Sequence, residues 1–460
     1  MPSGSPAQSG AQITPTQINP LGVFLANHGG DTGMRFWTLE RWRREIRDLK
    51  AMGANTIWYL PIQFGQREEA DFEDDAPHWK LQQGISQAIA GAGLAVGIYV
   101  GLNDVFSATA NANPAWKAKE GKYFLEEGQV CPSNPAALDV VMRLRERLFS
   151  RLPQVDYVIT PITDYGGCSC EKCAPYPRTY LRVLEQQAAA CRRSHPAAKF
   201  VAAGHAVGLD DEDLLRAQLK KSAWVDFIAD IPRGVKPIIK YYINPEITMV
   251  DGWGVFGPCP ALPAIRETYR RDYPHIGGAM PYSEGIHDDI NKFAVLRFAR
   301  NPNLTVQDVA RQYAEEMLGI TGGSAPRVAD AIAGMGHHAG IERAYFHTDF
   351  GPDNPHADDR TRALIDARSS TPKLGDNYRY WLLHYRAVCE SFSVPTGSLS
   401  ADVLVAEAEM ARQALLRLEP EYGRFLLGHH PSVLPGRSIW TWQRSFRAAW
   451  ERENTFLAAK

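Results

Sequence analysis

The feature that most constrains this fold is a regular alternation of short apolar runs with amphipathic segments along the first 300 residues. The apolar runs predict β-strands at 21–27, 55–64, 94–102, 157–164, 200–205, 225–230, 247–250 and 275–282. Helices are predicted between them at 37–52, 81–92, 138–152, 179–193, 211–221, 264–272 and 287–300. Strands that alternate with helices in this way are typical of a parallel sheet buried on both faces. Eight such units in about 280 residues predict an α/β fold, the (β/α)8 TIM barrel.

A doubly wound open sheet is the alternative, and it is disfavoured because no Gly-x-Gly-x-x-Gly turn follows an early strand. Strand-like runs vanish after residue 304, where helices are predicted at 306–318, 325–335, 378–392, 401–418 and 438–454, with a polar loop at 346–358. The expected organisation is therefore a flexible leader at 1–20, a barrel at 21–303 and a C-terminal all-helical domain at 304–460.

Charge and hydropathy argue against two classes of partner. Fifty Lys and Arg side chains stand against 52 Asp and Glu, a formal net charge of −2, which argues against a chain that binds nucleic acid through bulk positive charge. No apolar run approaches the roughly 18 residues of a membrane helix. The expected location is the cytoplasm, or outside it if a signal peptide has been removed. Assembly into a homo-oligomer is left open by the sequence.

The predicted strands end in polar, acidic and aromatic residues. In TIM barrels the reacting groups lie on the loops that follow the strands, at the carboxyl face. Amide, carboxylate and imidazole groups can bind sugar hydroxyls, and aromatic rings can bind the apolar faces of sugars. The candidate substrate-binding residues are His28, Asp31, Asn103, Tyr165, His205, Asp230, Glu246, Asp251, Trp253 and Tyr282. Glu246 precedes the predicted seventh strand, whereas Asp251 and Trp253 follow it.

Two carboxylates at predicted strand ends, Asp164 and Glu284, are the candidate catalytic pair. Glycoside hydrolysis needs two carboxyl groups, one acid and one nucleophile or base, and it requires no cofactor. No serine elbow, phosphate-binding loop or His-Glu-x-x-His sequence competes with this interpretation. The alternatives are a metal-dependent isomerase or lyase acting on a sugar, and a carbohydrate-binding barrel without activity. The expected partner is an oligosaccharide or glycoside.

Four of the seven cysteines form a sequence pattern suited to metal binding. Cys168, Cys170 and Cys173 lie within six positions, and Cys131 belongs to the preceding unit. Four thiolates could form a closed tetrahedral zinc site, which would be structural and would join the third and fourth loops. The alternatives are free thiols, or one disulfide in an exported protein.

Three segments carry a resemblance to a known group of enzymes. They are Val-Cys-Pro-Ser-Asn-Pro at 130–135, Asp-Tyr-Gly-Gly-Cys-Ser-Cys-Glu-Lys-Cys at 164–173, and Tyr-Ser-Glu-Gly-Ile at 282–286. Over about 21–303 the chain resembles barrel glycosidases allied to glycoside hydrolase families 20, 67, 84 and 163, and family 163 in particular. The resemblance implies that Asp164 is the acidic residue at the end of strand four. Tyr165 stands where hexosaminidases that use the substrate's acetamido group carry a second acid.

Overall fold

The computed structural model describes residues 18–27, 34, 37–120, 127–161, 167–203, 209–229, 238–240, 260–283, 289–335, 356–392 and 397–420. Within these residues the strands form one sheet in the order β8-β7-β6-β5-β4-β3-β2-β1-β9. Every neighbouring pair is parallel. The strands are β1 (Gly22–Leu25), β2 (Thr56–Tyr59), β3 (Ala95–Tyr99), β4 (Tyr157–Pro161), β5 (Lys199–Ala203), β6 (Phe227–Ala229), β7 (Ile238–Lys240), β8 (Ile276–Ala279) and β9 (Tyr282–Ser283).

The sheet closes on itself between its first and last strands. Leu21 forms a parallel bridge with Ala279, the last residue of β8, and β1 pairs with β9 a few residues further on. The Phe24 N–H donates to the Pro281 carbonyl across the gap between β8 and β9. These two short strands are therefore consecutive parts of one strand, and the described residues form the predicted TIM barrel.

Side chains alternate between the inside of the barrel and the helices around it. In β2, Trp58 lies in the apolar cluster that fills the barrel, whereas Ile57 and Tyr59 pack outward in the main core. The Trp58 ring lies 5.3 Å from the ring of Tyr157, centroid to centroid. A Cβ atom on Gly97 of β3 would come within 2.3 Å of the Trp58 ring, so this position requires glycine. The interior is a packed core rather than a channel.

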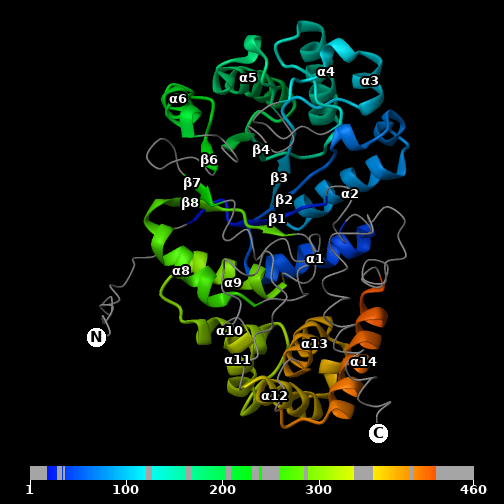
Figure 1. Cartoon of the computed structure of the whole chain (residues 1–460), viewed down its shortest axis with the longest axis vertical. Coiled ribbons are helices and arrows are strands. Elements are labelled where there is room, and N and C mark those ends of the chain that lie inside the picture. Colours follow the sequence, from blue (N-terminus) through cyan, green and yellow to red (C-terminus); the bar gives the residue numbers. More distant parts are fainter. Residues whose placement is uncertain are drawn as a thin grey trace.

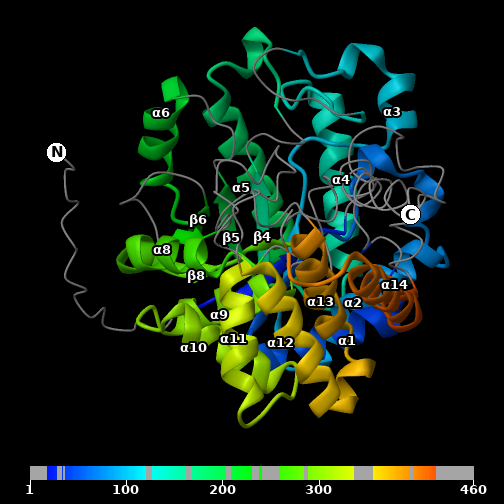
Figure 2. The same ribbon diagram turned by 60° about the horizontal axis from the view of Figure 1, so that its bottom comes forward.

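Helices cover the outside of the barrel (Figure 1). They are α1 (Leu39–Met52), α2 (Pro77–Gly91), α3 (Ser107–Ala112), α4 (Pro135–Arg151), α5 (Tyr176–Ser194), α6 (Leu209–Leu219), α8 (Leu262–Asp272) and α9 (Asp289–Arg300). The C-terminal helical region follows with α10 (Val306–Glu316), α11 (Ser324–Met335), α12 (Ala357–Ser370), α13 (Tyr378–Phe392) and α14 (Ala401–Leu418). Figure 1 shows this region below α1 and α9, and the turned view of Figure 2 brings it to the front. α10 packs against α8 and α9.

Several elements differ from the sequence prediction, among them α3, which it did not include. The seventh strand is β7, at 238–240, whereas the prediction placed it at 247–250, which lies outside the described residues. Helix α12 begins where the prediction placed the end of a polar loop. The predicted helix at 438–454 also lies outside the described residues. Among the described helices, none combines the length and apolar character that crossing a membrane requires.

Candidate active site and cysteine cluster

The parallel barrel brings the carboxyl ends of its strands to one face, and the predicted catalytic residues follow two of these ends in the chain. β4 ends at Pro161, three residues before Asp164, and β9 ends at Ser283, directly before Glu284. Both carboxylates lie outside the described residues. The same holds for most of the predicted substrate-binding residues, namely His28, Asp31, Tyr165, His205, Asp230, Glu246, Asp251 and Trp253.

The position of β7 corrects the prediction that Glu246 precedes the seventh strand. Because β7 ends at Lys240 and α8 begins at Leu262, Glu246 follows the seventh strand rather than preceding it. Together with Asp251 and Trp253 it lies in the chain between β7 and α8, outside the described residues. In a TIM barrel this kind of connection starts from the carboxyl face, where active sites form.

Tyr282, a predicted substrate-binding residue, lies in β9 with its side chain in the barrel interior. Its ring meets the Phe24 ring edge-on, with centroids 5.5 Å apart. The Phe24 ring in turn stacks on Tyr99 at 5.3 Å with an interplanar angle of 3°. These three aromatic side chains belong to the apolar cluster that fills the barrel. Tyr282 is thereby fixed by packing on at least one side.

Asn103, which follows β3, is fully buried with an exposed fraction of 0%. Its side-chain N–H groups donate to the carbonyl of Val130 at 2.6 Å and to the carbonyl of Gly167 at 3.2 Å. Its side-chain oxygen accepts from the Gly167 N–H at 3.2 Å. Asn103 thus joins three chain segments. The sequence prediction gave it a substrate contact, but it did not anticipate these backbone partners.

A buried ion pair fixes the segment that carries Asn103, and nothing in the sequence pattern pointed to Arg145 as one of its members. Arg145 of α4 pairs with Asp104 and also donates to the carbonyl of Gly101 at 2.9 Å. The second Asp104 oxygen accepts from the Phe64 N–H at 3.0 Å. Burial lowers the pKa of Arg145, and Asp104 opposes this effect. No spacing in the sequence links an arginine 41 positions away to this strand end.

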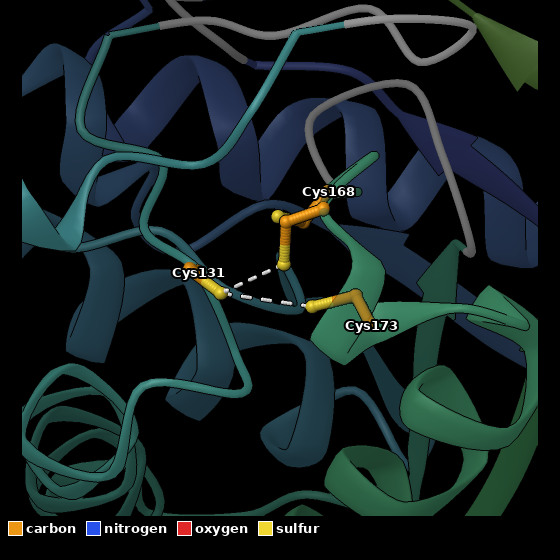
Figure 3. Close-up of side chains that lie close together, drawn as sticks. Cys131, Cys168 and Cys173 are labelled. Atoms are coloured by element: carbon orange, nitrogen blue, oxygen red, sulfur yellow. Dashed lines mark hydrogen bonds between the residues drawn. The ribbon is translucent and has the colours of Figure 1, made fainter.

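The four predicted cysteines meet in space. The sulfur atoms of Cys131, Cys168, Cys170 and Cys173 all lie within 4.8 Å of one another. The Cys131 Sγ is 3.6 Å from the Cys170 Sγ. It is also 3.6 Å from the Cys173 Sγ, and Figure 3 shows Cys131, Cys168 and Cys173 gathered around one point. None of the four forms a disulfide. We call these four residues the cysteine cluster.

Backbone contacts bring the two halves of the cysteine cluster together. The Ser169 N–H donates to the Lys119 carbonyl at 2.9 Å, and the Lys119 N–H donates to the Cys168 Sγ at 3.4 Å. Ser133 contacts the Cys173 sulfur at 3.1 Å and donates to the Lys172 carbonyl at 3.0 Å. The segment before α4 and the segment before α5 are therefore tied at several points.

The arrangement has the dimensions of a tetrahedral metal site. Zinc–sulfur bonds of about 2.3 Å place tetrahedral sulfur atoms about 3.8 Å apart, close to the two distances of 3.6 Å. Hydrogen bonds among the thiols lower the pKa of Cys168 and raise the pKa of Cys131 and of Cys173, so the metal interpretation depends on the distances and the donor set. The donor set is therefore compatible with a metal ion, and four sulfur ligands would leave no position open for a substrate.

Neither a family model nor a curated protein sequence matches this chain. Solved structures with a similar fold include a GH138 enzyme targeting pectin rhamnogalacturonan II, with a TM-score of 0.54 at 10% identity over 97% of this chain and 85% of that one. A family 89 glycoside hydrolase from Clostridium perfringens, in complex with PUGNAc, has a TM-score of 0.54 at 11% identity over 94% of this chain and 59% of that one. At these identities the similarity establishes only that this chain shares its fold with these two enzymes.

Proposed function

We propose that this chain is a glycoside hydrolase in which Asp164 and Glu284 act as the carboxylate pair. One observation carries the proposal: the closed parallel barrel brings the ends of β4 and β9 to the same face, and each strand leads within three residues into one of these carboxylates. The fold shared with family 138 and family 89 enzymes supports the same reaction class.

The two carboxylates would divide the reaction between them. One protonates the glycosidic oxygen as the bond breaks, and the other attacks the sugar carbon or activates water. A separation of about 5 Å would retain the configuration at that carbon, and 6.5–9.5 Å would invert it. We propose that His28, Asp31, Tyr165, His205, Asp230, Glu246, Asp251, Trp253 and Tyr282 contribute contacts to the sugar.

A substrate screen combined with amide substitutions tests the proposal. The protein is incubated with nitrophenyl glycosides and natural oligosaccharides, and products are detected by mass. Asp164→Asn and Glu284→Gln should each lower kcat at least about a hundredfold, because an amide neither transfers the proton nor stabilises the positive charge. Matched controls are Asp139→Asn and Glu315→Gln, which change surface carboxylates on α4 and α10. Both controls should keep full activity.

The other outcomes identify the alternatives. Sugar binding without turnover in the unmodified protein would indicate a carbohydrate-binding barrel. Turnover that depends on an added divalent ion and yields an isomer or an unsaturated product would indicate an isomerase or lyase. Full activity in both amide variants would exclude this carboxylate pair, and the remaining candidates would be Glu246, Asp251 and Asp230.

We further propose that the cysteine cluster binds one structural zinc ion. The four sulfur atoms lie within 4.8 Å of one another, and they come from two segments that the ion would hold together. Structural zinc sites of this kind contribute directly to folding free energy. The ion would take no part in the reaction, because four thiolates complete its coordination.

Metal analysis of the purified chain tests this second proposal. We expect about one zinc per chain, and a chelator should lower the melting temperature. Cys170→Ser should reduce the zinc content by more than half. Cys191→Ser is the matched control, because Cys191 is a buried thiol of α5 outside the cysteine cluster. A metal-free protein with an unchanged melting temperature in chelator would contradict the proposal.

A further inference from the structure

The side chain of Asn103 lies between the two halves of the cysteine cluster. Its N–H groups donate to Val130 and Gly167, which are the residues directly before Cys131 and Cys168. The Gly167 N–H also returns a hydrogen bond to the Asn103 side-chain oxygen, so the contact with Gly167 has two bonds. A single buried amide therefore holds the backbone beside one thiol of each segment.

Gly167 also follows the segment that contains Asp164 in the chain. It has a φ of +119°, a conformation that favours glycine, and it is the first described residue after β4 and its connection. Pro161, the last residue of β4, and Gly167 are the described residues on either side of positions 162–166, which include Asp164. Asn103 thus binds a residue that stands in the chain directly before Cys168 and three positions after Asp164.

We infer that Asn103 is a positioning residue that couples the cysteine cluster to the segment carrying Asp164. The inference deepens the proposed function and rests on it where Asp164 is concerned. It gives Asn103 a role different from the substrate contact that the sequence suggested. The coupling needs an amide at this position, because the site requires donors toward two carbonyls and an acceptor toward one N–H.

The support behind Asn103 makes it rigid. The Val130 N–H donates to the Asn103 carbonyl at 3.0 Å. Gln187 of α5 donates to the Leu102 carbonyl at 2.9 Å, and Arg145 donates to Gly101 at 2.9 Å. The segment that carries the amide is therefore held by α4 and α5 independently of the cysteine cluster. Supporting hydrogen bonds of this kind set the geometry of metal ligands and reacting groups in general.

Thiol alkylation measures this coupling without a sugar substrate. The full chain is treated with iodoacetamide, and modification of each cysteine is followed by peptide mass spectrometry. Cys168 and Cys191 are both buried, and Cys191 lies in α5 outside the cluster, so it reports global opening. In Asn103→Ala we expect the ratio of the Cys168 rate to the Cys191 rate to rise at least about tenfold, because Gly167 loses its partners.

Two further variants sharpen the test. Asn103→Asp keeps the shape but replaces the donor with a carboxylate oxygen that faces two carbonyls, and it should raise the ratio at least as much as Asn103→Ala. The matched control is Asn377→Ala, because Asn377 donates to the Met317 carbonyl at 2.7 Å and accepts from the Arg379 N–H at 3.0 Å in the helical region. The control should leave the ratio within twofold. If Asn103→Ala does not fold, Asn103→Ser carries the same test.

The outcomes separate this inference from the proposed function. An unchanged ratio in the Asn103 variants, or an equal rise at Cys191, would overturn the coupling whatever the protein hydrolyses. A raised ratio in a protein without glycosidase activity would support the coupling to the cysteine cluster and reject its link to catalysis. With an active substrate, the Asn103 variants should lower kcat with KM nearly unchanged, because Asn103 positions Asp164 and does not touch the sugar.

Discussion

Two regions of this molecule join distant segments of the chain, one through neutral amide and thiol groups and the other through buried charges. In the first, the sector around β3 and β4, a neutral amide and four thiols connect the segments that precede α4 and α5. In the second, which we call the junction, buried charges connect α1 and α9 with the C-terminal helical region. The first region should respond to chelators and thiol reagents, and the second to pH and to the loss of a charge.

The junction contains two groups of charges. Glu45 of α1, with an exposed fraction of 0%, accepts from Lys292 of α9 at 2.6 Å and from Arg41 at 3.0 Å. Arg41 also reaches Glu419, at the end of α14, at 3.0 Å. Burial alone would raise the pKa of Glu45, but Lys292 and Arg41 outweigh it and hold the value at about 2.

The second group surrounds Asp289 at the start of α9. Its carboxylate accepts from Tyr313 of α10 at 2.8 Å, from Tyr378 of α13 at 3.1 Å and from Arg379 at 2.8 Å. Arg379 also pairs with Asp48 of α1 at 2.7 Å. One carboxylate thus joins three helices. Because these charges are buried, removing one partner should affect the whole chain rather than one loop.

The largest effect is expected from removing one charge of the junction. Lys292→Met keeps the side-chain volume but leaves Glu45 with fewer cationic partners in a buried site. Breaking a buried ion pair in this way typically destabilises a protein by about 3–5 kcal/mol. Urea unfolding at pH 7 measures the free energy of unfolding.

The control for this change is Arg311→Met on α10. Arg311 forms an exposed pair with Glu315, at 3.3 Å, and exposed helical pairs contribute about 0.5 kcal/mol or less. If Lys292→Met loses no more unfolding free energy than Arg311→Met, the junction does not depend on its charges. The contrast between the two regions would then be wrong.

Acid should destabilise the junction by an amount similar to, or slightly smaller than, the loss expected for Lys292→Met. Glu45 is depressed in the folded protein, so its contribution is complete above its usual pKa of 4.5 and is lost as the pH falls toward about 2. This shift corresponds to about 3 kcal/mol. Burial raises the pKa of Asp48 and of Glu419, so these two groups act in the opposite direction and offset part of the loss.

Urea unfolding across this pH range tests the acid effect. Glu45→Gln removes the titrating group, so its stability should depend less steeply on pH between about 4.5 and 2 than that of the unmodified chain. Equal slopes in the two proteins would mean that Glu45 does not set the acid sensitivity of the junction.

A smaller effect is expected from the buried pair in the β3 and β4 sector. Asp104→Asn removes the charge that faces Arg145, but the guanidinium keeps its bonds to the carbonyls of Gly101 and residue 104. We therefore expect a loss of about 2 kcal/mol in unfolding free energy. Asp139→Asn, at an exposed pair on α4, should change stability by less than about 0.5 kcal/mol. Equal losses of unfolding free energy in the two variants would mean that the Asp104–Arg145 pair does not stabilise this sector.

The strand and helix pattern could be predicted from sequence, and the exceptions have physical reasons. β7 was wrongly placed because Ile238–Lys240 ends in a charged residue, whereas the β-branched and apolar run at 247–250 has a stronger strand pattern. α12 was missed because its first turn holds Asp358 and Asp359 and its apolar residues are few. Packing against α11 and α13 stabilises α12 as a helix, and the local sequence does not show these contacts.

The cysteine cluster could be predicted because thiols are few and their spacing is distinctive. Its supports could not be predicted, since the Asn103 amide bonds to backbone groups 27 and 64 positions away. The junction is a stronger case, because Arg41 and Glu419 are separated by 378 positions. Hydrogen bonds between such distant segments depend on the tertiary fold, and nothing in the local pattern of either residue indicates its partner. The catalytic roles of Asp164 and Glu284 stay predictions.

The smallest loss of stability is expected from removing a helix N-cap, and each region contains one such cap. Asn134 caps α4 by accepting from the Ala136 and Ala137 N–H groups, and Thr305 caps α10 by accepting from the Asp308 N–H. Asn134→Ala and Thr305→Ala should each lower the unfolding free energy by about 1 kcal/mol.

The two caps should nevertheless differ in their effect on the thiols. The Asn134 N–H donates to the Cys131 carbonyl at 3.0 Å, so fraying the first turn of α4 loosens one segment of the cysteine cluster. Asn134→Ala should therefore speed alkylation of Cys131 by about threefold relative to Cys191. Thr305→Ala, at equal loss of stability, should leave this ratio unchanged, because α10 contacts α8, α9 and α11 and lies apart from the thiols. If both variants raise the ratio equally, thiol exposure follows global stability, and the β3 and β4 sector is not an independently anchored region.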